Sequence, residues 1–341
     1  MNLQIFLVIS SKIYHTIVEI RDLLYRNGIF REYKLDARVI SVGNITWGGT
    51  GKTNLVLFLA EKLTSGNHKV AILIRGYKRK EKGTMIVQPG AKDIPWQEVG
   101  DEAKLLASRL DSVPIIVGKD RVKSGRKAID RYSADFLILD DGFQHRRLER
   151  DIDIVMLDSQ DPFGNEKLIP AGKLREPLEN IKRANVLVLN RAQSGHNKME
   201  LIHRLRKHNP IAPIVETEYA VEKIYELKDK NKTILPEEMK DKKILGFCGI
   251  GNPWGFKRTL EDLGAKILEF IVFPDHYAYR EKDMRKIEKG AQDKGVEFIL
   301  TTEKDNMRLF PTSKISSPIY IVRIQTKIIS GEKELWDRIY G

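Results

Sequence analysis

The sequence predicts an α/β fold in which helices cover a mostly parallel sheet. From residue 37 onward, short apolar runs alternate with helical stretches, and strands buried on both faces of a parallel sheet read as such continuous runs. The chain is 41% hydrophobic and 31% charged, which is typical of folded domains rather than disordered ones. At roughly 100–200 residues per domain, the 341 residues predict two domains.

The first 36 residues are predicted to form an amphipathic helical segment. Within residues 1–26, apolar side chains recur at steps of three and four and polar ones form the opposite face. Charged residues interrupt this stretch, whereas a membrane-spanning helix needs roughly 20 mostly apolar residues. The local pattern fits both a helix that packs on the protein's own core and a helix that lies in a membrane interface.

The alternating pattern predicts one domain over residues 37–212. Its expected strands and helices are strands at 39–42, 70–74, 113–117, 136–139, 152–157 and 186–189, and helices at 54–63, 102–110 and 121–131. Residues 213–241 are rich in charge and break the rhythm, and we expect an extended linker there. A second α/β pattern predicts a smaller C-terminal domain over residues 242–341, with strands at 244–249, 265–272, 298–301 and 319–322 and helices at 254–263 and 280–294.

Charge and cysteine content narrow the possible partners. The single cysteine, Cys248, excludes an internal disulfide framework and a multi-cysteine zinc site. The formal net charge of +12 indicates an anionic partner, which could be nucleic acid, acidic lipid or a phosphorylated substrate. No recognised nucleic-acid-binding signature is present, so we expect no nucleic-acid partner.

The strongest chemical signal follows the first predicted strand. Residues 41–53 read Ser-Val-Gly-Asn-Ile-Thr-Trp-Gly-Gly-Thr-Gly-Lys-Thr, a glycine-rich loop whose N–H groups can point at phosphate oxygens. Lys52 can reach the β- and γ-phosphates, and the Thr53 hydroxyl can bind Mg²⁺. Thr46 stands where the general motif has its first glycine. The pattern predicts a P-loop NTPase-like sheet with nucleotide-binding residues Thr46, Trp47, Gly48, Gly49, Thr50, Gly51, Lys52 and Thr53.

A metal partner for this loop is expected at the end of a neighbouring strand. The run Phe136-Leu-Ile-Leu ends in Asp140 and Asp141, and Gln144 and His145 follow close behind. The Asn/Thr-Lys-x-Asp pattern of guanine-specific proteins is absent, which favours adenine and therefore ATP with Mg²⁺.

Two further clusters do not belong to nucleotide binding in general. Asp101 and Glu102 follow Gly100 at the start of a predicted helix, where carboxylates commonly serve only as caps. His276 lies in Phe273-Pro-Asp-His-Tyr277 after a predicted strand, where a lone histidine is more often structural.

Together these segments resemble one family, the tetraacyldisaccharide 4′-kinases of lipid A biosynthesis. The matching pieces span residues 1 to about 310 and are 42–53, 75–77, 100–102, 139–145, 170–177, 273–276 and 301–305. The family's own phosphate loop also lacks the first glycine, so Thr46 agrees with it, whereas Trp47 is bulkier than the small aliphatic residue expected.

The resemblance implies transfer of the ATP γ-phosphoryl group to the 4′-hydroxyl of an acylated glucosamine disaccharide 1-phosphate. A sugar hydroxyl needs a base to accept its proton, and the resemblance assigns Asp101 to this role, with His276 polarising it or relaying the proton. Lys52 and Mg²⁺ would offset the charge of the transferring group. The implied residues at or near the metal are Thr53, Glu102, Asp140, Asp141 and Gln144, and the implied contacts to substrate or phosphate are Arg75, His145 and Arg175. Whether Arg175 holds ATP or the substrate stays open.

A substrate with four acyl chains also bears on location. The resemblance favours the interfacial interpretation of residues 1–26 and a peripheral position on the cytoplasmic face of the bacterial inner membrane. The anionic membrane surface is then a partner for the basic residues, including Lys78, Arg79, Lys80, Lys82 and those at 119–127, and no obligate protein partner is evident. The alternative is a membrane-associated P-loop ATPase or GTPase switch protein, which would not need Asp101 and His276.

Overall fold

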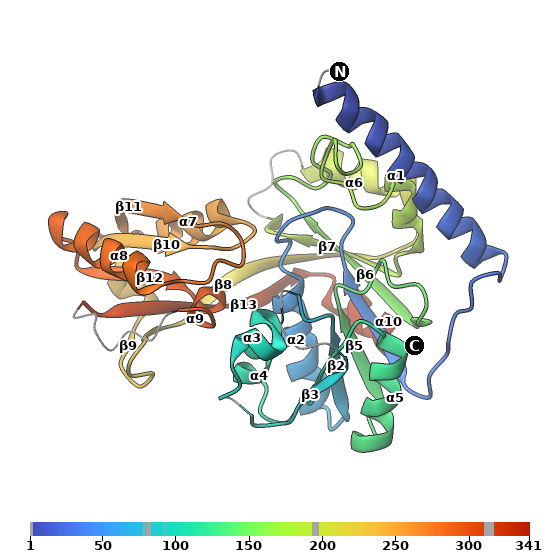
Figure 1. Ribbon diagram of the computed structural model, residues 1–341, viewed down its shortest axis with the longest axis horizontal. Helices are drawn as coiled ribbons and strands as arrows, with labels where there is room; N and C mark the ends of the chain where they lie inside the picture. Colours follow the sequence, from blue (N-terminus) through green and yellow to red (C-terminus); the bar gives the residue numbers. More distant parts are fainter. Residues whose placement is uncertain (1–2, 78, 80–82, 92, 193–197, 310–316) are drawn as a thin grey trace.

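The computed structural model of the chain describes residues 3–77, 79, 83–91, 93–192, 198–309 and 317–341 (Figure 1). Lys78, Lys80 and Lys82, three of the basic residues expected to face lipid, lie outside this described part. We call residues 37–212 the N-terminal region and residues 242–309 the C-terminal region.

One continuous mixed sheet runs through both regions. Its strands are β1 (Arg38–Gly43), β2 (Val70–Ile74), β3 (Met85–Val87), β4 (Ile115–Val117), β5 (Phe136–Asp140), β6 (Ile152–Asp158), β7 (Val186–Asn190), β8 (Ile214–Glu226), β9 (Thr233–Ile234), β10 (Lys243–Cys248), β11 (Lys266–Val272), β12 (Phe298–Thr302) and β13 (Ile319–Ser330). Their order is β11-β10-β12-β13-β8-β7-β6-β1-β5-β2-β4-β3, and β9 pairs only with β8. Most neighbours are parallel, so the predicted fold class is confirmed.

Helices cover both faces of this sheet. They are α1 (Leu3–Arg26), α2 (Lys52–Ser65), α3 (Trp96–Val99), α4 (Asp101–Arg109), α5 (Arg121–Tyr132), η1 (Leu178–Arg183), α6 (Lys198–His208), η3 (Pro236–Met239), α7 (Pro253–Asp262), α8 (Glu281–Asp293), α9 (Glu303–Asn306) and α10 (Glu332–Tyr340). Successive residues of the central strands enter different core clusters: Ile138 packs with α2 and α4, whereas Leu137 and Leu139 pack with α5. This two-sided burial explains why the central strands are apolar at nearly every position.

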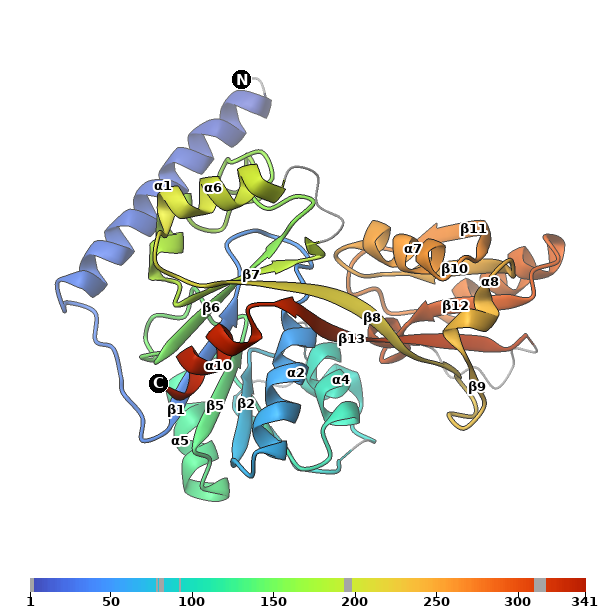
Figure 2. The ribbon, with the colours of Figure 1, turned by 180° about the vertical axis from the view of Figure 1, so that it is seen from behind.

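The expected linker at 213–241 is extended, but it is built into the sheet. It contains β8 and β9, and β8 pairs with β7 at one end and along most of its length with the antiparallel strand β13. Figure 2 shows β8 and β13 side by side, running from the N-terminal region into the C-terminal region. The division of the chain into domains at the predicted boundaries stays a prediction.

The end of the chain returns to the N-terminal region. Leu335 and Ile339 of α10 are fully buried in the same core cluster as Leu59 of α2 and Ile40 of β1. The apolar run at 319–322 predicted only the first part of this path, because it gave no sign that β13 continues to Ser330.

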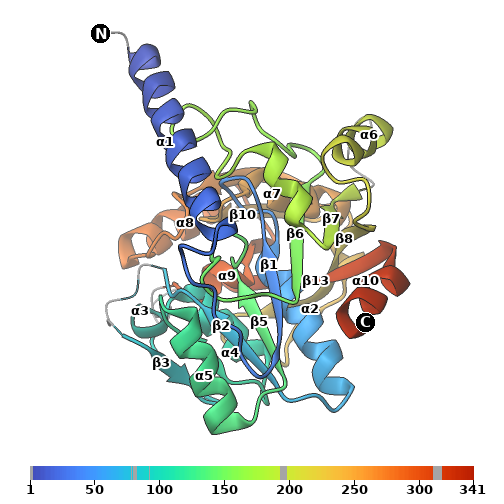
Figure 3. The same ribbon diagram turned by 90° about the vertical axis from the view of Figure 1, so that its right-hand side faces the viewer.

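Helix α1 lies along the outside of the N-terminal region, and its first turns project beyond the rest of the protein (Figure 3). Only Val18 and Asp22 of this helix are buried, whereas Ile9, Ile13 and Ile17 are about half exposed. Within the described part of the chain, α1 alone is long and apolar enough to cross a membrane, a weak criterion that helices of other kinds also meet.

We predict that α10 stabilises the N-terminal region. Ile339→Ala should lower the free energy of unfolding by about 2–5 kcal/mol, because it leaves a cavity beside α2. The solvent-exposed control Lys333→Ala on the same helix should change it by less than about 0.5 kcal/mol. Urea unfolding followed by circular dichroism measures both, and equal unfolding curves for the two variants would contradict the assignment of α10 to this core.

Candidate active site

The phosphate-binding candidate loop lies between β1 and α2, as the sequence predicted. Gly51 caps α2 with a left-handed φ of 92°, and a Cβ at this position would overlap the Tyr219 hydroxyl, so only glycine fits. Side-chain amides fix the loop from two sides: Asn44 Nδ2 donates to Thr50 Oγ1 at 3.2 Å, and Asn190 Nδ2 donates to the Thr50 carbonyl at 3.1 Å. Lys52 and Thr53 therefore enter the first turn of α2, where free backbone N–H groups favour an anion.

The loop also touches the C-terminal region. A Cβ at Gly251 would lie 2.9 Å from the backbone nitrogen of Gly49, so the two backbones pass too closely for any larger residue. Trp47 and Gly48 remain exposed at the rim of the loop. The nucleotide-binding candidate is thus bordered by both regions.

Side-chain oxygens suited to Mg²⁺ lie at the end of β5 and just after it, and Asp140 among them contacts Thr53. The Thr53 hydroxyl donates to Asp140 Oδ2 at 3.2 Å, and Gln144 Oε1 is buried without a hydrogen-bond partner in the described structure. Burial, reinforced by the nearby charge of Glu102, raises the pKa of Asp140 to about 7. Across the described residues no group of three or more His, Cys, Asp and Glu side chains could hold a metal. Mg²⁺ usually takes only a few of its oxygen ligands from the protein, and water and phosphate oxygens complete its coordination shell. Thr53, Asp140 and Gln144 therefore fit this ion.

Asp141 and Arg175 bind each other rather than standing free. The Arg175 guanidinium donates to both carboxylate oxygens of Asp141 at 2.7 and 3.1 Å and to Asn44 Oδ1 at 3.2 Å. Lys52 Nζ lies 3.4 Å from Asp141 Oδ1. Burial acts in the opposite direction, but Lys52 and Arg175 together hold the pKa of Asp141 well below its usual value. Asp141 was expected at the metal and Arg175 at a phosphate, and the structure joins them in one ion pair.

The two residues expected to form a dyad meet across the two regions. Asp101 is the first residue of α4, and His276 lies in the loop after β11 with a left-handed φ of 59°. His276 Nδ1 is 2.7 Å from Asp101 Oδ2, although 175 positions separate them in the chain. The ring of Tyr77, an exposed residue beyond β2, lies 5.2 Å from the His276 ring.

Two cations that the sequence did not single out complete this contact. The fully buried Arg308 donates to Asp101 Oδ2 at 2.9 Å and to Asp305 Oδ1 at 2.6 Å, and Lys304 Nζ donates to Glu102 Oε1 at 2.9 Å. Burial alone would raise the pKa of Asp101, but the hydrogen bond to His276 and the nearby cations lower it to about 2. The family resemblance includes residues 301–305 but implies no role for Lys304, and Arg308 lies outside all of the segments that carry the resemblance.

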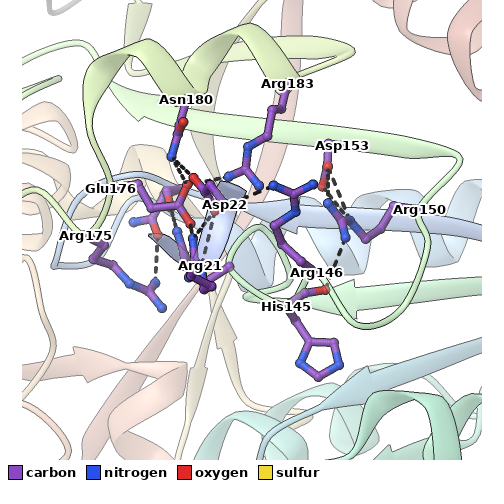
Figure 4. Close-up of polar contacts among 12 residues, drawn as sticks. Arg21, Asp22, His145, Arg146, Arg150, Asp153, Arg175, Glu176, Asn180 and Arg183 are labelled. Carbon is purple, nitrogen blue, oxygen red and sulfur yellow. Dashed lines mark hydrogen bonds and ion pairs between the residues drawn. The ribbon is translucent and has the colours of Figure 1, made fainter. Parts of the chain in front are cut away.

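Arg75 and His145 lie at the edge of this arrangement. Arg75 is exposed at the end of β2. Burial and the neighbouring Arg121 lower the pKa of His145 to about 4, so its ring is neutral at pH 7 and can contact a phosphate only as a hydrogen-bond donor. In Figure 4 this ring points away from the labelled cluster of acidic and basic side chains.

A family model described as "LpxK: Tetraacyldisaccharide-1-P 4'-kinase" matches residues 3–340. The chain belongs to the tetraacyldisaccharide 4′-kinase family. A relative of that name from Halothermothrix orenii is 41% identical over 315 residues, which are 89% of this chain and 82% of the relative. Another from Syntrophus aciditrophicus is 39% identical over 337 residues, which are 95% of this chain and 89% of the relative.

A solved structure of the same family agrees in fold. LpxK from Aquifex aeolicus, crystallised in complex with ATP, superposes with a TM-score of 0.75 at 34% identity and covers 100% of both chains. The resemblance stated from the sequence is therefore confirmed, and with it an ATP-dependent kinase family.

We predict that Mg²⁺ binding at Asp140 depends on pH. Because the pKa of Asp140 is raised to about 7, the carboxyl is protonated below that pH and must lose its proton to bind the metal. The affinity for Mg²⁺ should fall by up to about tenfold per pH unit below pH 7 and level off above it. Calorimetric titration of Mg²⁺ between pH 5.5 and 8.5 measures this, with Asp140→Asn as the control that abolishes the dependence. A pH-independent affinity in the unmodified protein would contradict the assignment.

Proposed function

We propose that this chain transfers the γ-phosphoryl group of ATP to the 4′-hydroxyl of tetraacyldisaccharide 1-phosphate in lipid A biosynthesis. The observation that carries the proposal is the 2.7 Å contact between Asp101 and His276 beside the phosphate loop. A nucleotide switch protein would leave this contact without a chemical role. The family membership of the chain supports the same reaction.

Asp101 and His276 together would accept the proton of the sugar hydroxyl. The hydroxyl becomes a competent nucleophile only as its proton leaves, and a hydrogen-bonded carboxylate and imidazole provide the acceptor. Because His276 and the cations Lys304 and Arg308 hold the pKa of Asp101 near 2, the carboxylate stays ionised at neutral pH. Asp101 would thus act as the base, and His276, 2.7 Å away, would polarise it or relay the proton.

The phosphate loop would bind and orient the nucleotide. Lys52 lies within reach of the loop's anion site, where it would offset charge on the transferring phosphoryl group. Mg²⁺, held by Thr53, Asp140 and Gln144, would neutralise the phosphate oxygens when bound, with Glu102 near it. Arg175, which donates to Asp141 in this structure, would be a contact for either ATP or the substrate.

The substrate places the reaction at a membrane surface. A disaccharide with four acyl chains stays in a bilayer, and the exposed apolar side chains of α1 offer a surface that can enter its interface. We propose a peripheral position on the cytoplasmic face of the bacterial inner membrane, where ATP is present. The net charge of +12 would add attraction to the anionic membrane surface. We propose neither a nucleic-acid partner nor an obligate protein partner for this reaction.

Lys52→Ala should abolish phosphoryl transfer while leaving the fold intact. Loss of one charge-stabilising donor typically lowers the rate by about 100–1,000-fold. The assay uses labelled ATP, Mg²⁺ and the detergent-dispersed acyl disaccharide 1-phosphate, and it follows the label on lipid. Lys62→Ala, at the exposed far end of the same helix, is the matched control and should retain full turnover. Near-normal turnover of folded Lys52→Ala protein would exclude the phosphate-loop role.

Replacing Ile9, Ile13 and Ile17 with serine should release the protein from vesicles and spare ATP binding. These side chains are 47%, 58% and 58% exposed, so their removal takes apolar area from a lipid contact rather than from the core. Flotation with vesicles containing anionic lipid measures the release, and Glu19→Ser on the same helix should float like the unmodified protein. Unfolding of the triple variant would instead mean that this stripe belongs to the protein's own core.

A further inference from the structure

Helix α1 uses its other face to bind the segment that carries Arg175. Ser11 Oγ donates to the Leu168 carbonyl at 2.9 Å, and Tyr14 Oη donates to the Arg175 carbonyl at 2.8 Å. Both contacts join residues more than 150 positions apart in the chain. The helix is therefore attached to this segment by specific hydrogen bonds to its backbone.

The next residue in the segment, Glu176, is a buried carboxylate that forms an ion pair with Arg21 of the same helix. The Glu176 side chain is 0% exposed and accepts from Arg21 Nη2 at 2.9 Å, from Asn180 Nδ2 at 3.0 Å and from Arg183 (Figure 4). Asn180 also donates to Asp22 Oδ2 at 2.8 Å. A buried charge that loses a partner is strongly destabilised, so Arg21 holds Glu176, and with it the segment, in one position.

Arg175 lies between α1 and the phosphate loop and is held at its backbone N–H, its carbonyl and the two terminal nitrogens of its guanidinium. Its backbone nitrogen donates to the Ile45 carbonyl at 2.7 Å, its carbonyl accepts from Tyr14, and its guanidinium grips Asp141. Asp141 in turn lies 3.4 Å from Lys52. A continuous chain of polar contacts thus leads from the surface helix to the lysine of the phosphate loop.

We propose that α1 is a positioning element of the active site, in which Tyr14 and Arg21 hold residues 175–176 so that Arg175 stays paired with Asp141. This inference rests on the proposed function for its kinetic readout. Arg175 and Lys52 share the charge of Asp141, so that Lys52 can turn toward phosphate while Arg175 keeps Asp141 neutralised; when Arg175 is displaced, Lys52 would remain the cation paired with Asp141. The helix that would rest on lipid with its apolar face therefore supports the phosphate loop with its polar face.

Tyr14→Phe is the sharpest test, because it removes a single hydroxyl and keeps the packed ring. Loss of one hydrogen bond should weaken the binding of Mg·ATP and lower kcat, so that the ratio of kcat to the Kd of Mg·ATP falls by about fivefold. Tyr25→Phe on the same helix is the matched control, because the Tyr25 hydroxyl makes no hydrogen bond within the described residues while its ring packs against Phe30 and Arg146. It should behave as the unmodified protein. Flotation with vesicles should be unchanged in both variants, because the apolar stripe is intact.

Arg21 provides a second, stronger variant with a conservative rescue. Arg21→Gln should lower kcat by more than Tyr14→Phe does, whereas Arg21→Lys, which keeps the charge beside Glu176, should recover part of the loss. Arg26→Gln, one turn further along and exposed, is the control. If Arg21→Gln does not fold, Tyr14→Phe alone decides the proposal.

A double-mutant cycle with Arg175→Gln shows whether the helix acts through Arg175. We expect Tyr14→Phe to have almost no further effect on kcat or on the Kd of Mg·ATP once Arg175 is replaced. Equal losses in both backgrounds, loss of vesicle binding by Tyr14→Phe, or identical behaviour of Tyr14→Phe and Tyr25→Phe would each overturn the proposal. The Kd cycle needs no lipid acceptor, so if the unmodified protein fails to label lipid, the proposed function fails while this cycle still decides the role of α1.

Discussion

The antiparallel pairing of β8 with β13 sets the distance between the phosphate loop and the loop that carries His276. Paired residues extend from Tyr320 and Glu226, beside the C-terminal region, to Ser330 and Glu216, beside the N-terminal core. The pair of strands thus joins the two regions, and α10 at the end of β13 packs on α2, the helix that begins with Lys52. Because of this pairing, the two parallel parts of the one sheet, whose carboxyl ends carry different chemistry, are held at a fixed separation.

Charge then decides how the facing groups behave. Arg308 and His276 share one oxygen of Asp101, and Lys304 holds Glu102 next to it. Such buried pairs add little stability over an apolar contact, but removing one partner leaves an uncompensated charge, so they favour one relative placement of the regions. The same surroundings separate the acidic groups: the pKa of Asp101 is lowered to about 2, whereas that of Asp140 is raised to about 7. Divergent pKa values of neighbouring carboxyls are typical of groups with different roles in one reaction.

The sequence allowed most of the fold and the centre of the site to be predicted, and the exceptions have physical reasons. Strands buried on both faces are apolar throughout, and a strand, glycine loop and Lys-Thr in register define the phosphate loop locally. Arg308 could not be found, because a buried arginine has no periodicity or motif and gains its meaning only from Asp101, 207 positions away. Asp141 was predicted near the metal, and its ion pair with Arg175, 34 positions away in the chain, has no local sequence signal. Helix α1 fits both interpretations left open by its sequence, because Tyr14 and Arg21 bind the protein while the isoleucine stripe stays exposed.

The central claim is that Asp101 and His276, brought together from the two regions, act as one unit in accepting the proton of the substrate hydroxyl. The most direct measurement is kcat for Asp101→Ala, His276→Ala and the double variant, with lipid acceptor and saturating Mg·ATP. The account predicts that each single change lowers kcat by on the order of 100–10,000-fold and that the double variant is hardly slower than either one. Losses that multiply in the double variant would show that the two residues work independently and would contradict the account.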